Sequence, residues 1–241
     1  MKKKVSILFE DDHLVILNKP ANYLSIPDRF APAQANLLGY LRNRQEEVFV
    51  VHRIDRETSG IICFAKTAAA HKSLSQQFEN RTVKKIYQVL VEGHLHQNEG
   101  AIDLPIAPSK SKAGKMVIAK RGKASLTEYR LLETFKHYSL LAADIKTGRT
   151  HQIRVHFEAI GYPLAVDAVY GRKAEFYLSQ VKLKKYRPNR LEEERPLMSR
   201  TSLHAYELQL MHPVSGDNLT FQAPLPKDFK AVLQQLRKWG K

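Results

Sequence analysis

Alternating apolar and polar positions predict a protein in which strands predominate and a few helices separate them. An alternating stretch that is interrupted by a short polar turn and then resumes is the usual signature of a β-hairpin. In the first such stretch, VSILFEDDHLVILN, the turn falls at Asp11 and Asp12. Three stretches have this pattern: residues 5–18, 125–147 and 203–224.

Apolar residues spaced three or four positions apart predict helices. Thr67 is a suitable N-cap for a helix in which Ala70, Leu74 and Phe78 lie on one face. Four helices are predicted. The first covers residues 36–45, the second follows Thr67 as its N-cap, the third runs from Thr150 as N-cap to Ile160, and the fourth begins at Phe229.

These patterns predict an α+β protein: a mixed, largely antiparallel sheet with flanking helices, in a single domain over residues 1–241. Two short apolar runs, 48–51 and 61–65, are predicted to be buried strands joined by a polar loop. Residues 101–123 have loop signals and many basic side chains. Residues 172–200 are charged and weakly periodic, so we expect an insertion there, either a mobile loop or a short helix with a tail.

The charge balance indicates a polyanionic partner. Lys and Arg number 39 against 24 Asp and Glu, which gives a formal net charge of +15. Such an excess attracts polyanions and raises their local concentration. Nucleic acid is the first candidate, an anionic membrane surface is the second, and a generally basic protein without such a partner is the third.

Other bulk properties favour a cytoplasmic location. No apolar run approaches the roughly 18 residues of a membrane span. The first residues, MKKKVSILFEDDHLVIL, lack an uninterrupted apolar region and a small-residue cleavage site, so a secretory signal is not expected. Cys63 is the single cysteine and lies in the apolar segment IICFA, so we expect a buried, inert thiol in a reducing compartment.

The sequence predicts neither a metal site nor a bound cofactor. The phosphate-binding and dinucleotide-binding glycine motifs and the nucleophile elbow are absent. Ten histidines are present, but His151 and His156 are five positions apart on a predicted helix and therefore lie on different faces.

Two segments combine the residue types that chemistry needs. The first, HRIDRETSG, places Asp55 between Arg53 and Arg56 on a loop that emerges from buried strands. The two positive charges favour the ionised carboxylate, as a nucleophile requires. The alternative is a surface aspartate in a loop salt bridge.

The second segment, TGRTHQIR, concentrates cationic and hydrogen-bonding side chains in one strand-to-helix turn. The exposed amide groups of such a turn also attract anions. The alternative is a capped helix with solvated charges, so neither segment names a reaction by itself.

Together, the two segments resemble a known family. HRIDRETSG resembles the catalytic loop of the RluA-type RNA pseudouridine synthases, and GRTHQIRVHFEAIGYPLAVDAVYG resembles that family's second signature. The resemblance continues, in the family's order, in EDDHLVILNKPANYLSIP, FENRTVKKIYQVLVEG and LHAYELQLMHPVSGDNLTFQAPLP. It implies a pseudouridine synthase-like catalytic domain in its standalone form, without the amino-terminal RNA-binding module.

The resemblance implies roles for five residues. Asp55 corresponds to the catalytic aspartate, and Arg53 to the arginine that fills the space left by the extruded nucleotide. Tyr87 matches the tyrosine that packs against the flipped uracil. Arg154 matches the basic residue that pairs with the catalytic carboxylate, and Leu203 matches an apolar residue of the base pocket.

The implied reaction converts uridine to pseudouridine in structured RNA, either large-subunit ribosomal RNA or transfer RNA. It needs no cofactor, because nothing is oxidised and no group is imported, and we expect a monomer. The sequence leaves open whether Asp55 attacks the ribose, attacks the uracil ring or first helps to expel the base. One departure is Asn22, which follows KPA where family members often have glycine.

Two other kinds of protein compete with this interpretation. One is a catalytically inactive RNA-binding protein or RNA chaperone on the same fold, which the intact set of implied site residues disfavours. The other is a hydrolase that uses Asp55 and Glu57 as an acid–base pair. The flanking arginines would not raise the pKa of either residue to suit a general acid, so this alternative is weaker.

Overall fold

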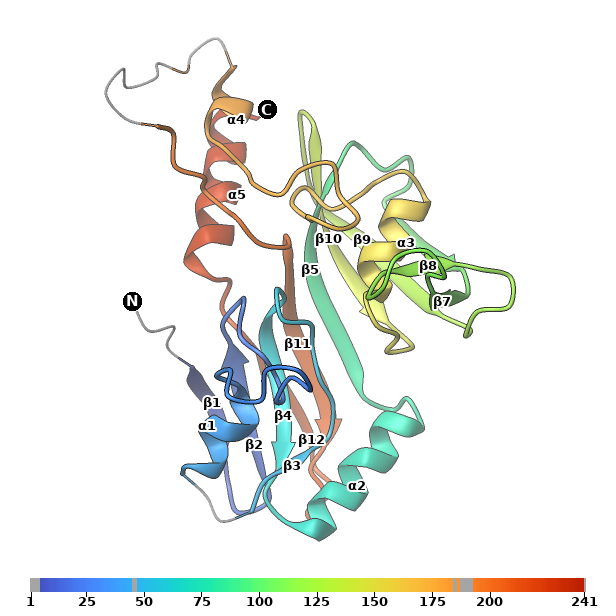
Figure 1. Ribbon diagram of the computed structural model, residues 1–241, viewed down its shortest axis with the longest axis vertical. Coiled ribbons are helices and arrows are strands. Elements are labelled where there is room, and N and C mark those ends of the chain that lie inside the picture. The colour runs from blue at the N-terminus through green and yellow to red at the C-terminus, as the bar shows by residue number, and fades with distance from the viewer. Residues whose placement is uncertain (1–4, 45–46, 184–185, 187–192, 241) are drawn as a thin grey trace. The chain divides into compact units, whose positions relative to one another are not determined.

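The computed structural model describes residues 5–44, 47–183, 186 and 193–240. They divide into two compact units, each built from two stretches of the chain (Figure 1). The first unit consists of Met1–Tyr87 and His204–Pro224, and the second of Gln88–Leu203 and Leu225–Lys241. We describe each unit by itself. The prediction of a single domain over residues 1–241 stays a prediction.

The first unit contains most of the predicted hairpin strands and two helices. Its elements are β1 (Ser6–Glu10), β2 (Leu14–Lys19), α1 (Leu37–Arg42), β3 (Phe49–Val50), β4 (Ser59–Ala65), α2 (Ala68–Glu79), the start of β5 (Lys84–Glu92), β11 (Leu203–Met211) and β12 (Asn218–Gln222). The strands are ordered β1-β2-β4-β11, with β3 beside β4 and β12 beside β11. The β4–β11 pair is parallel, and the other pairs of this unit whose register is defined are antiparallel.

The second unit contains the rest of β5 and a second set of antiparallel strands. Its elements are β6 (Glu99–Asp103), β7 (Ile106–Pro108), β8 (Met116–Ile118), β9 (Leu126–Phe135), β10 (Tyr138–Ile145), α3 (Gln152–Ala159), α4 (Ser179–Lys182) and α5 (Lys227–Trp239). The strands are ordered β5-β10-β9-β6, and β7 and β8 form a separate pair. The predicted α+β class with a mixed, largely antiparallel sheet is therefore confirmed.

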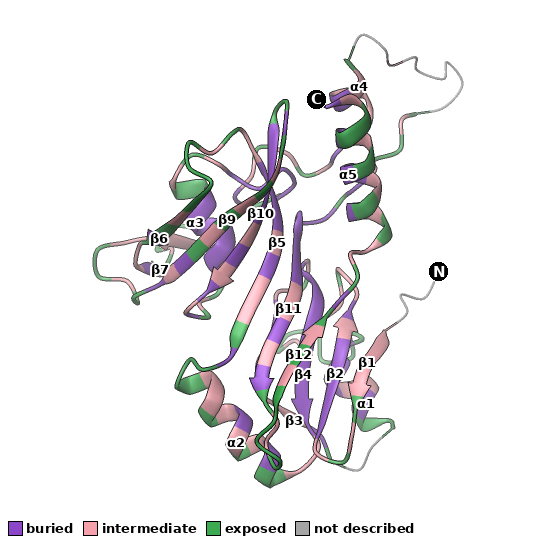
Figure 2. Cartoon of the chain, turned by 180° about the vertical axis from the view of Figure 1, so that it is seen from behind, coloured by how far each residue is buried: buried purple, intermediate pink, exposed green. Residues whose placement is uncertain are grey.

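In the first unit, β2 and β4 are buried on both faces, and Figure 2 shows both strands in purple. Leu14 and Ile16 belong to one core cluster with Leu74 of α2. Val15 and Leu17, on the opposite face of β2, belong to another cluster with the residues of α1. Each helix therefore covers one face, which explains why these strands read as continuous apolar runs.

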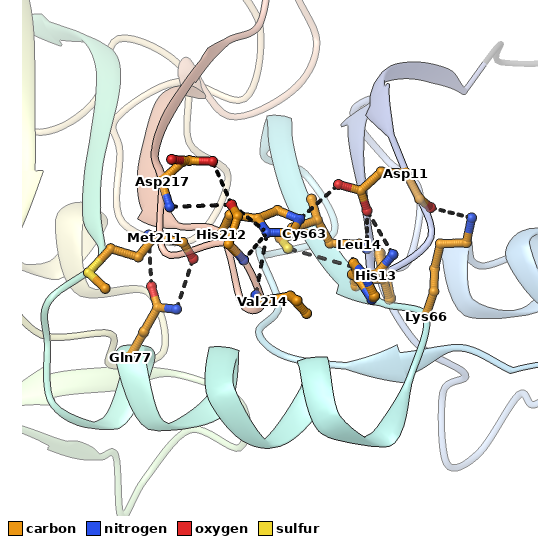
Figure 3. Close-up of polar contacts among 12 residues, drawn as sticks. Asp11, His13, Leu14, Cys63, Lys66, Gln77, Met211, His212, Val214 and Asp217 are labelled. Carbon is orange, nitrogen blue, oxygen red and sulfur yellow. Dashed lines mark hydrogen bonds and ion pairs between the residues drawn. The ribbon is translucent and has the colours of Figure 1, made fainter.

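A network of polar contacts links the turns of the first unit (Figure 3). Asp11 Oδ1 accepts hydrogen bonds from the amides of His13 and Leu14, which fixes the predicted β1–β2 turn. Asp11 Oδ2 lies 3.0 Å from Nε2 of His212, at the end of β11. Cys63 is buried nearby in β4, as predicted, and burial raises the pKa of its thiol, so the thiol stays protonated.

Most predicted elements are present, with shifted ends. Thr67 caps α2, because its hydroxyl accepts a hydrogen bond from the amide of Ala70. The helix predicted over residues 36–45 ends at Arg42, and its predicted end at Gln45 lies outside the described residues. In the insertion predicted at 172–200, α4 is a short helix, whereas 184–185 and 187–192 lie outside the described residues.

Residues 101–123, in which the sequence shows loop signals, contain the end of β6 and the short strands β7 and β8 besides irregular chain. One prediction about local structure was wrong. Thr150 was expected to cap α3, but the N-cap is His151, which has a left-handed backbone (φ 56°) and makes no side-chain capping bond. Among the described residues, no helix is both long and apolar enough to cross a membrane.

Candidate active site

Asp55 lies on the loop that connects β3 to β4 in the first unit. Its side chain is half-buried, and both flanking arginines, Arg53 and Arg56, are exposed. The amide of Thr58 donates a 3.2 Å hydrogen bond to the carbonyl of Asp55, which closes a tight turn. The loop therefore presents a carboxylate beside two cations that extend into solvent.

The segment that follows β2 holds this loop on both sides of Asp55. Ser25 Oγ donates a 2.9 Å hydrogen bond to the carbonyl of Ile54, immediately before Asp55. The amide of Tyr23 donates to the carbonyl of Arg56, immediately after it, at 3.3 Å. The backbone on either side of the carboxylate is thus fixed by residues about 30 positions earlier in the chain.

Lys19 is a fully buried lysine that supports the same loop. Its ammonium group donates hydrogen bonds to the carbonyls of Pro20, Tyr23 and Arg56, at 3.2, 2.8 and 2.9 Å. A buried ammonium is costly unless it is fully engaged. The NKPANY segment therefore provides acceptors for Lys19, and Lys19 in turn fastens this segment to the Asp55 loop.

Asn22, the departure from the family pattern, adopts a left-handed backbone conformation with φ of 56°. Glycine adopts this conformation without strain, and asparagine is one of the few other residues that tolerate it. The turn is therefore retained without glycine.

Gly60 ends the loop where β4 begins beside β11. Its φ is +113°, and a Cβ at this position would lie 2.1 Å from the carbonyl oxygen of Ala205. Next to it, Ser59 Oγ is hydrogen-bonded at 2.9 Å to Nδ1 of the buried His204. Ser59 and Gly60, the last two residues of HRIDRETSG, therefore form the parallel pairing between β4 and β11.

His52, the first residue of the motif, has a structural role. Its Nε2 accepts a 3.0 Å hydrogen bond from the amide of Cys63, and its ring stacks on Phe78 at 4.5 Å between centroids. Burial, together with the charge of Lys85, lowers the pKa of His52 to about 3. The ring is therefore neutral at physiological pH and is not one of the cations of the loop.

Tyr87, on β5, is the second predicted site residue in the first unit. Its side chain is buried, and burial together with the negative charge of Asp55 raises the pKa of its phenol. The phenol therefore stays protonated and can donate a hydrogen bond. Asp55 and Tyr87 are 32 positions apart in the sequence, yet the charge of Asp55 acts on the phenol of Tyr87 in the structure.

In the second unit, Arg154 forms a buried, two-bonded ion pair with Asp167. Nε and Nη2 of Arg154 lie 2.6 and 2.8 Å from the two carboxylate oxygens, and the side chains are 3% and 0% exposed. Such a geometry fixes the plane of the guanidinium group. The orientation of Arg154 is therefore set by an aspartate that the sequence did not single out.

Asp167 also organises the turn on which it lies. Its Oδ1 accepts hydrogen bonds from the amides of Val169 and Tyr170, at 2.9 and 3.1 Å. Burial alone would raise the pKa of this carboxyl, but the contacts with Arg154 and the two amides outweigh burial and hold the pKa below its ordinary value. The sequence feature that could have indicated this role of Asp167 is Gly171, four positions later, because an aspartate followed closely by a glycine is typical of a tight turn.

Tyr170 joins this turn to the N-terminus of α3 and to β8. Its ring lies 5.0 Å from Cζ of Arg154 and 5.0 Å from Nζ of Lys115. Its hydroxyl accepts a hydrogen bond from the amide of Met116 and lies 2.8 Å from Nδ1 of His151. Tyr170 is a second residue of this cluster that sequence reasoning missed.

The TGRTHQIR segment is held by Gln152 rather than by a threonine cap. Oε1 of Gln152 accepts hydrogen bonds from the hydroxyl of Thr147 and the amide of Arg149, at 2.6 and 3.1 Å. Its Nε2 donates to Leu126 and Thr127 of β9. This side chain therefore replaces the expected cap and attaches the turn to the sheet.

Leu203, the fifth predicted residue, is buried at the start of β11, and its carbonyl accepts a hydrogen bond from Arg200. Arg53, Asp55 and Tyr87 thus lie in the first unit, and Arg154 and Leu203 in the second. Among the described residues, no group of three or more histidine, cysteine or acidic side chains is arranged to hold a metal ion.

The second unit also has a pocket of about 580 Å³ with a basic lining. Lys136, Arg172 and Lys173 contribute positive charges, and Glu92 forms ion pairs with Arg172 and Lys173, at 3.4 and 3.1 Å. Lys136 and Arg172 are exposed. Cations in this arrangement suit a phosphate-bearing ligand.

Comparison with known proteins identifies the family of this chain. Residues 13–159 match the model of a family described as RNA pseudouridylate synthase. The chain is 39% identical to ribosomal large subunit pseudouridine synthase D of Nitrosomonas europaea over 97% of its length, and 34% identical to the uncharacterized RNA pseudouridine synthase YhcT of Bacillus subtilis over 94%. The chain belongs to the RNA pseudouridylate synthase family.

The structure of human RNA Pseudouridylate Synthase Domain Containing 1 is also similar, with a TM-score of 0.67 and 26% identity. This match covers 97% of the present chain and 95% of the human one. The chain spans 65% of the length of the Nitrosomonas protein and 70% of that of the Bacillus protein.

Proposed function

We propose that the protein is an RNA pseudouridine synthase that isomerises specific uridines in structured RNA, with Asp55 as the catalytic residue. The observation that carries this proposal is the loop of Asp55. Its backbone is fixed on both sides by Lys19, Tyr23 and Ser25, its side chain is half-buried, and its negative charge acts on the protonated phenol of Tyr87. A fixed backbone keeps a reactive group in place without further reorganisation, which catalysis requires.

The proposed reaction is an isomerisation. The bond between N1 of uracil and C1′ of ribose breaks, the uracil rotates, and a new bond forms between its C5 and C1′. The hydrogen of C5 is released to solvent as a proton, and N1, which carried no hydrogen in uridine, takes up a proton, so atoms and electrons balance without an oxidant. No cofactor is needed for this balance.

The target base must leave its helix to reach Asp55, and unstacking costs a few kcal/mol. We propose that Arg53, which is exposed, occupies the space that the extruded nucleotide leaves. The ring of Tyr87 would pack against the uracil, and stacking of a base on an aromatic ring recovers about 1–3 kcal/mol. These two contacts would offset much of the cost of extrusion.

Arg154 and Leu203 are proposed to complete the machinery. Arg154 is assigned as the cation that supports the catalytic carboxylate, and Asp167 and Tyr170 fix its guanidinium group. Leu203 is assigned to the apolar lining for the uracil.

The substrate is proposed to be large-subunit ribosomal RNA, because the Nitrosomonas relative is named for that activity. Transfer RNA is the second candidate. The charge of +15 and the basic pocket of the second unit suit either polyanion. The enzyme is further proposed to act as a cytoplasmic monomer.

The test is release of tritium from RNA that is labelled at C5 of uridine. The wild type is expected to release tritium. Asp55→Ala and Asp55→Asn are expected to reduce release by roughly 10³-fold or more, because both remove the carboxylate on which the proposed reaction depends. Both variants should bind RNA and unfold at temperatures close to that of the wild type. Equal release by wild type and variants would remove Asp55 from its role.

The competing proposal is an inactive RNA-binding protein on the same fold. It predicts that wild type and Asp55→Ala bind RNA equally well and that neither releases tritium from total RNA of a strain that lacks the gene. Pseudouridine mapping in the same RNA, with and without the protein, would then identify the target position.

A further inference from the structure

Phe30 is an aromatic side chain that the fold does not use. It is 97% exposed, whereas the next most exposed large apolar side chain of the described residues, Val214, is 61% exposed. Single exposed apolar side chains are common on protein surfaces. Phe30 differs in that its whole ring is in solvent while its backbone is held in place.

The backbone of Phe30 is fixed by Asp28. Oδ1 of Asp28 accepts hydrogen bonds from the amides of Phe30 and Ala31, at 2.8 and 3.2 Å. Pro27 and Pro32 restrict the chain on either side of this turn. The ring is therefore presented to solvent by a defined turn rather than by a flexible tail.

The base of the same loop is fastened to the Asp55 loop. The amides of Leu37 and Leu38 donate hydrogen bonds to the carbonyls of Leu24 and Ser25, at 2.9 and 3.2 Å, which closes the loop at its base. Ser25 also holds Ile54, the residue before Asp55, through its hydroxyl.

Phe30 follows Ser25 by five positions. The chain between them spans at most about 18 Å, which corresponds to about five nucleotides of a stacked strand. An RNA whose target uridine lies at Asp55 therefore has neighbouring nucleotides within reach of the ring.

We infer that Phe30 is a stacking platform for an unpaired base of the substrate RNA, a few nucleotides from the target uridine. This inference rests on the proposed function. Unstacked bases are the parts of RNA that proteins read most often, and aromatic side chains are their usual platforms. Arg29, which is exposed beside Phe30, supplies a cation for the phosphate of the same nucleotide.

The proposal assigns Phe30 to substrate selection. A stacking platform favours targets in loops or bulges over targets that are flanked by paired bases, because only an unpaired base can turn onto the ring. It contributes to RNA affinity and to the choice of uridine rather than to bond breaking at Asp55.

The test compares Phe30→Ala, Phe30→Leu and Phe30→Tyr in binding to a stem-loop RNA that contains the target uridine. Binding is measured in the Asp55→Ala background, so that turnover plays no part. Phe30→Ala and Phe30→Leu are expected to weaken binding about 5- to 100-fold, the effect of losing one stacked base, and Phe30→Tyr to bind within about twofold of Phe30. Leucine is the decisive substitution, because it is apolar and large but has no π-face.

A spectroscopic readout reports stacking directly. In Phe30→Trp, stem-loop RNA is expected to quench the fluorescence of the introduced indole beyond any quenching of Trp239 in the wild type. Val214→Ala, an exposed apolar side chain of the same unit, is the matched control and should bind RNA as the wild type does.

Binding by Phe30→Leu that equals that of Phe30, or an introduced indole that RNA does not quench, would overturn the proposal. Failure of the proposed enzymatic function has a different signature. In that case the wild type releases no tritium, while the binding difference between phenylalanine and leucine persists.

Discussion

The Asp55 loop of the first unit and the Asp167 turn of the second unit both combine an aspartate with arginine, but they treat the charges in opposite ways. Asp55 is half-buried and its neighbours Arg53 and Arg56 are exposed. Asp167 and Arg154 are both buried, and the carboxylate accepts four hydrogen bonds. Asp55 is thus partly exposed to solvent, whereas Asp167 uses its carboxylate to fix a turn and a guanidinium group.

The supports of the two regions differ in the same way. The Asp55 loop is held through its backbone carbonyls, by the hydroxyl of Ser25 and the ammonium of Lys19. The Asp167 turn is held through its carboxylate side chain. The comparison teaches that a loop can be fixed through its backbone carbonyls in one region and through a carboxylate side chain in another.

The largest expected effect is on stability, from Asp167→Ala. This change leaves Arg154 buried without its bidentate partner, and breaking a buried ion pair typically costs about 3–5 kcal/mol. Urea unfolding should show this loss of unfolding free energy. Asp228→Ala is the matched control, because Asp228 makes the same bidentate contact with Arg200 but its side chain is 32% exposed.

The control should lose less stability and keep its RNA-modifying activity per folded molecule, whereas Asp167→Ala should lose both. Asp167→Asn, which retains the shape, should be milder and still impair turnover. If both substitutions of Asp167 leave stability and turnover at wild-type levels, the contrast between the two regions fails.

The same pair predicts a pH dependence. The folded pKa of Asp167 lies below its ordinary value of 3.8, so the pair contributes stability that is complete above that value and is lost as the pH falls toward the folded pKa. The difference in unfolding free energy between wild type and Asp167→Asn should therefore narrow as the pH is lowered below about 4. A constant difference down to pH 2 would contradict this assignment.

An intermediate effect is expected from Lys19→Met, which removes the ammonium from the Asp55 loop. Three carbonyl groups lose a buried donor, which should cost about 2–4 kcal/mol. Displacement of the loop should also lower kcat/KM about 10- to 100-fold in the tritium assay.

Lys66→Met is the control for this prediction. Lys66 donates to the carbonyl of Asp11 in the turn network of the same unit, so its loss should affect stability but not turnover. Equal turnover by the two variants would show that Lys19 is only a structural residue.

The smallest effect on stability is expected from Arg172→Gln. Arg172 is 70% exposed, so its ion pair with Glu92 adds little to stability, and unfolding free energy should change by less than about 0.5 kcal/mol. If the pocket contacts RNA phosphate, the slope of log affinity against log salt should decrease by about 0.7–0.9 for each contact removed. Lys230→Gln, which removes an exposed cation on α5, is the control. If the salt dependence of binding has the same slope for Arg172→Gln and Lys230→Gln, the pocket is not part of the RNA interface.

Much of the fold could be predicted from local patterns. Strand β9 alternates in burial over nine of its ten residues, so a period of two can be recognised in a strand of this length. In contrast, β7 and β8 have three residues each, which is too short for a period to be seen among basic and glycine residues. The N-terminus of α3 was misread because Gln152, through contacts with β9, overrides the capping preference of a threonine.

The residue pattern by itself singled out only candidate residues that are close in sequence, whereas Tyr87 and Leu203 were named through the family resemblance. The HRIDRETSG motif identified Asp55 and Arg53, but nothing in it indicated that Lys19 and Ser25 hold the loop from 37 and 29 positions away. Asp167 was missed for the same reason, since its partner Arg154 lies 13 positions earlier, on a different element. Such supports depend on tertiary contacts, which a single sequence does not display.

Lys19 contributes to the positive charge that first indicated a polyanionic partner, yet its ammonium group is enclosed by backbone carbonyls. A reagent that modifies lysine amines can reach it only when the segment after β2 separates from the Asp55 loop. The rate at which Lys19 is modified, compared with that of surface lysines, therefore measures how often the hydrogen bonds between Lys19 and these carbonyls break in the folded protein. The residue that secures the site is thus also a natural chemical reporter of its integrity.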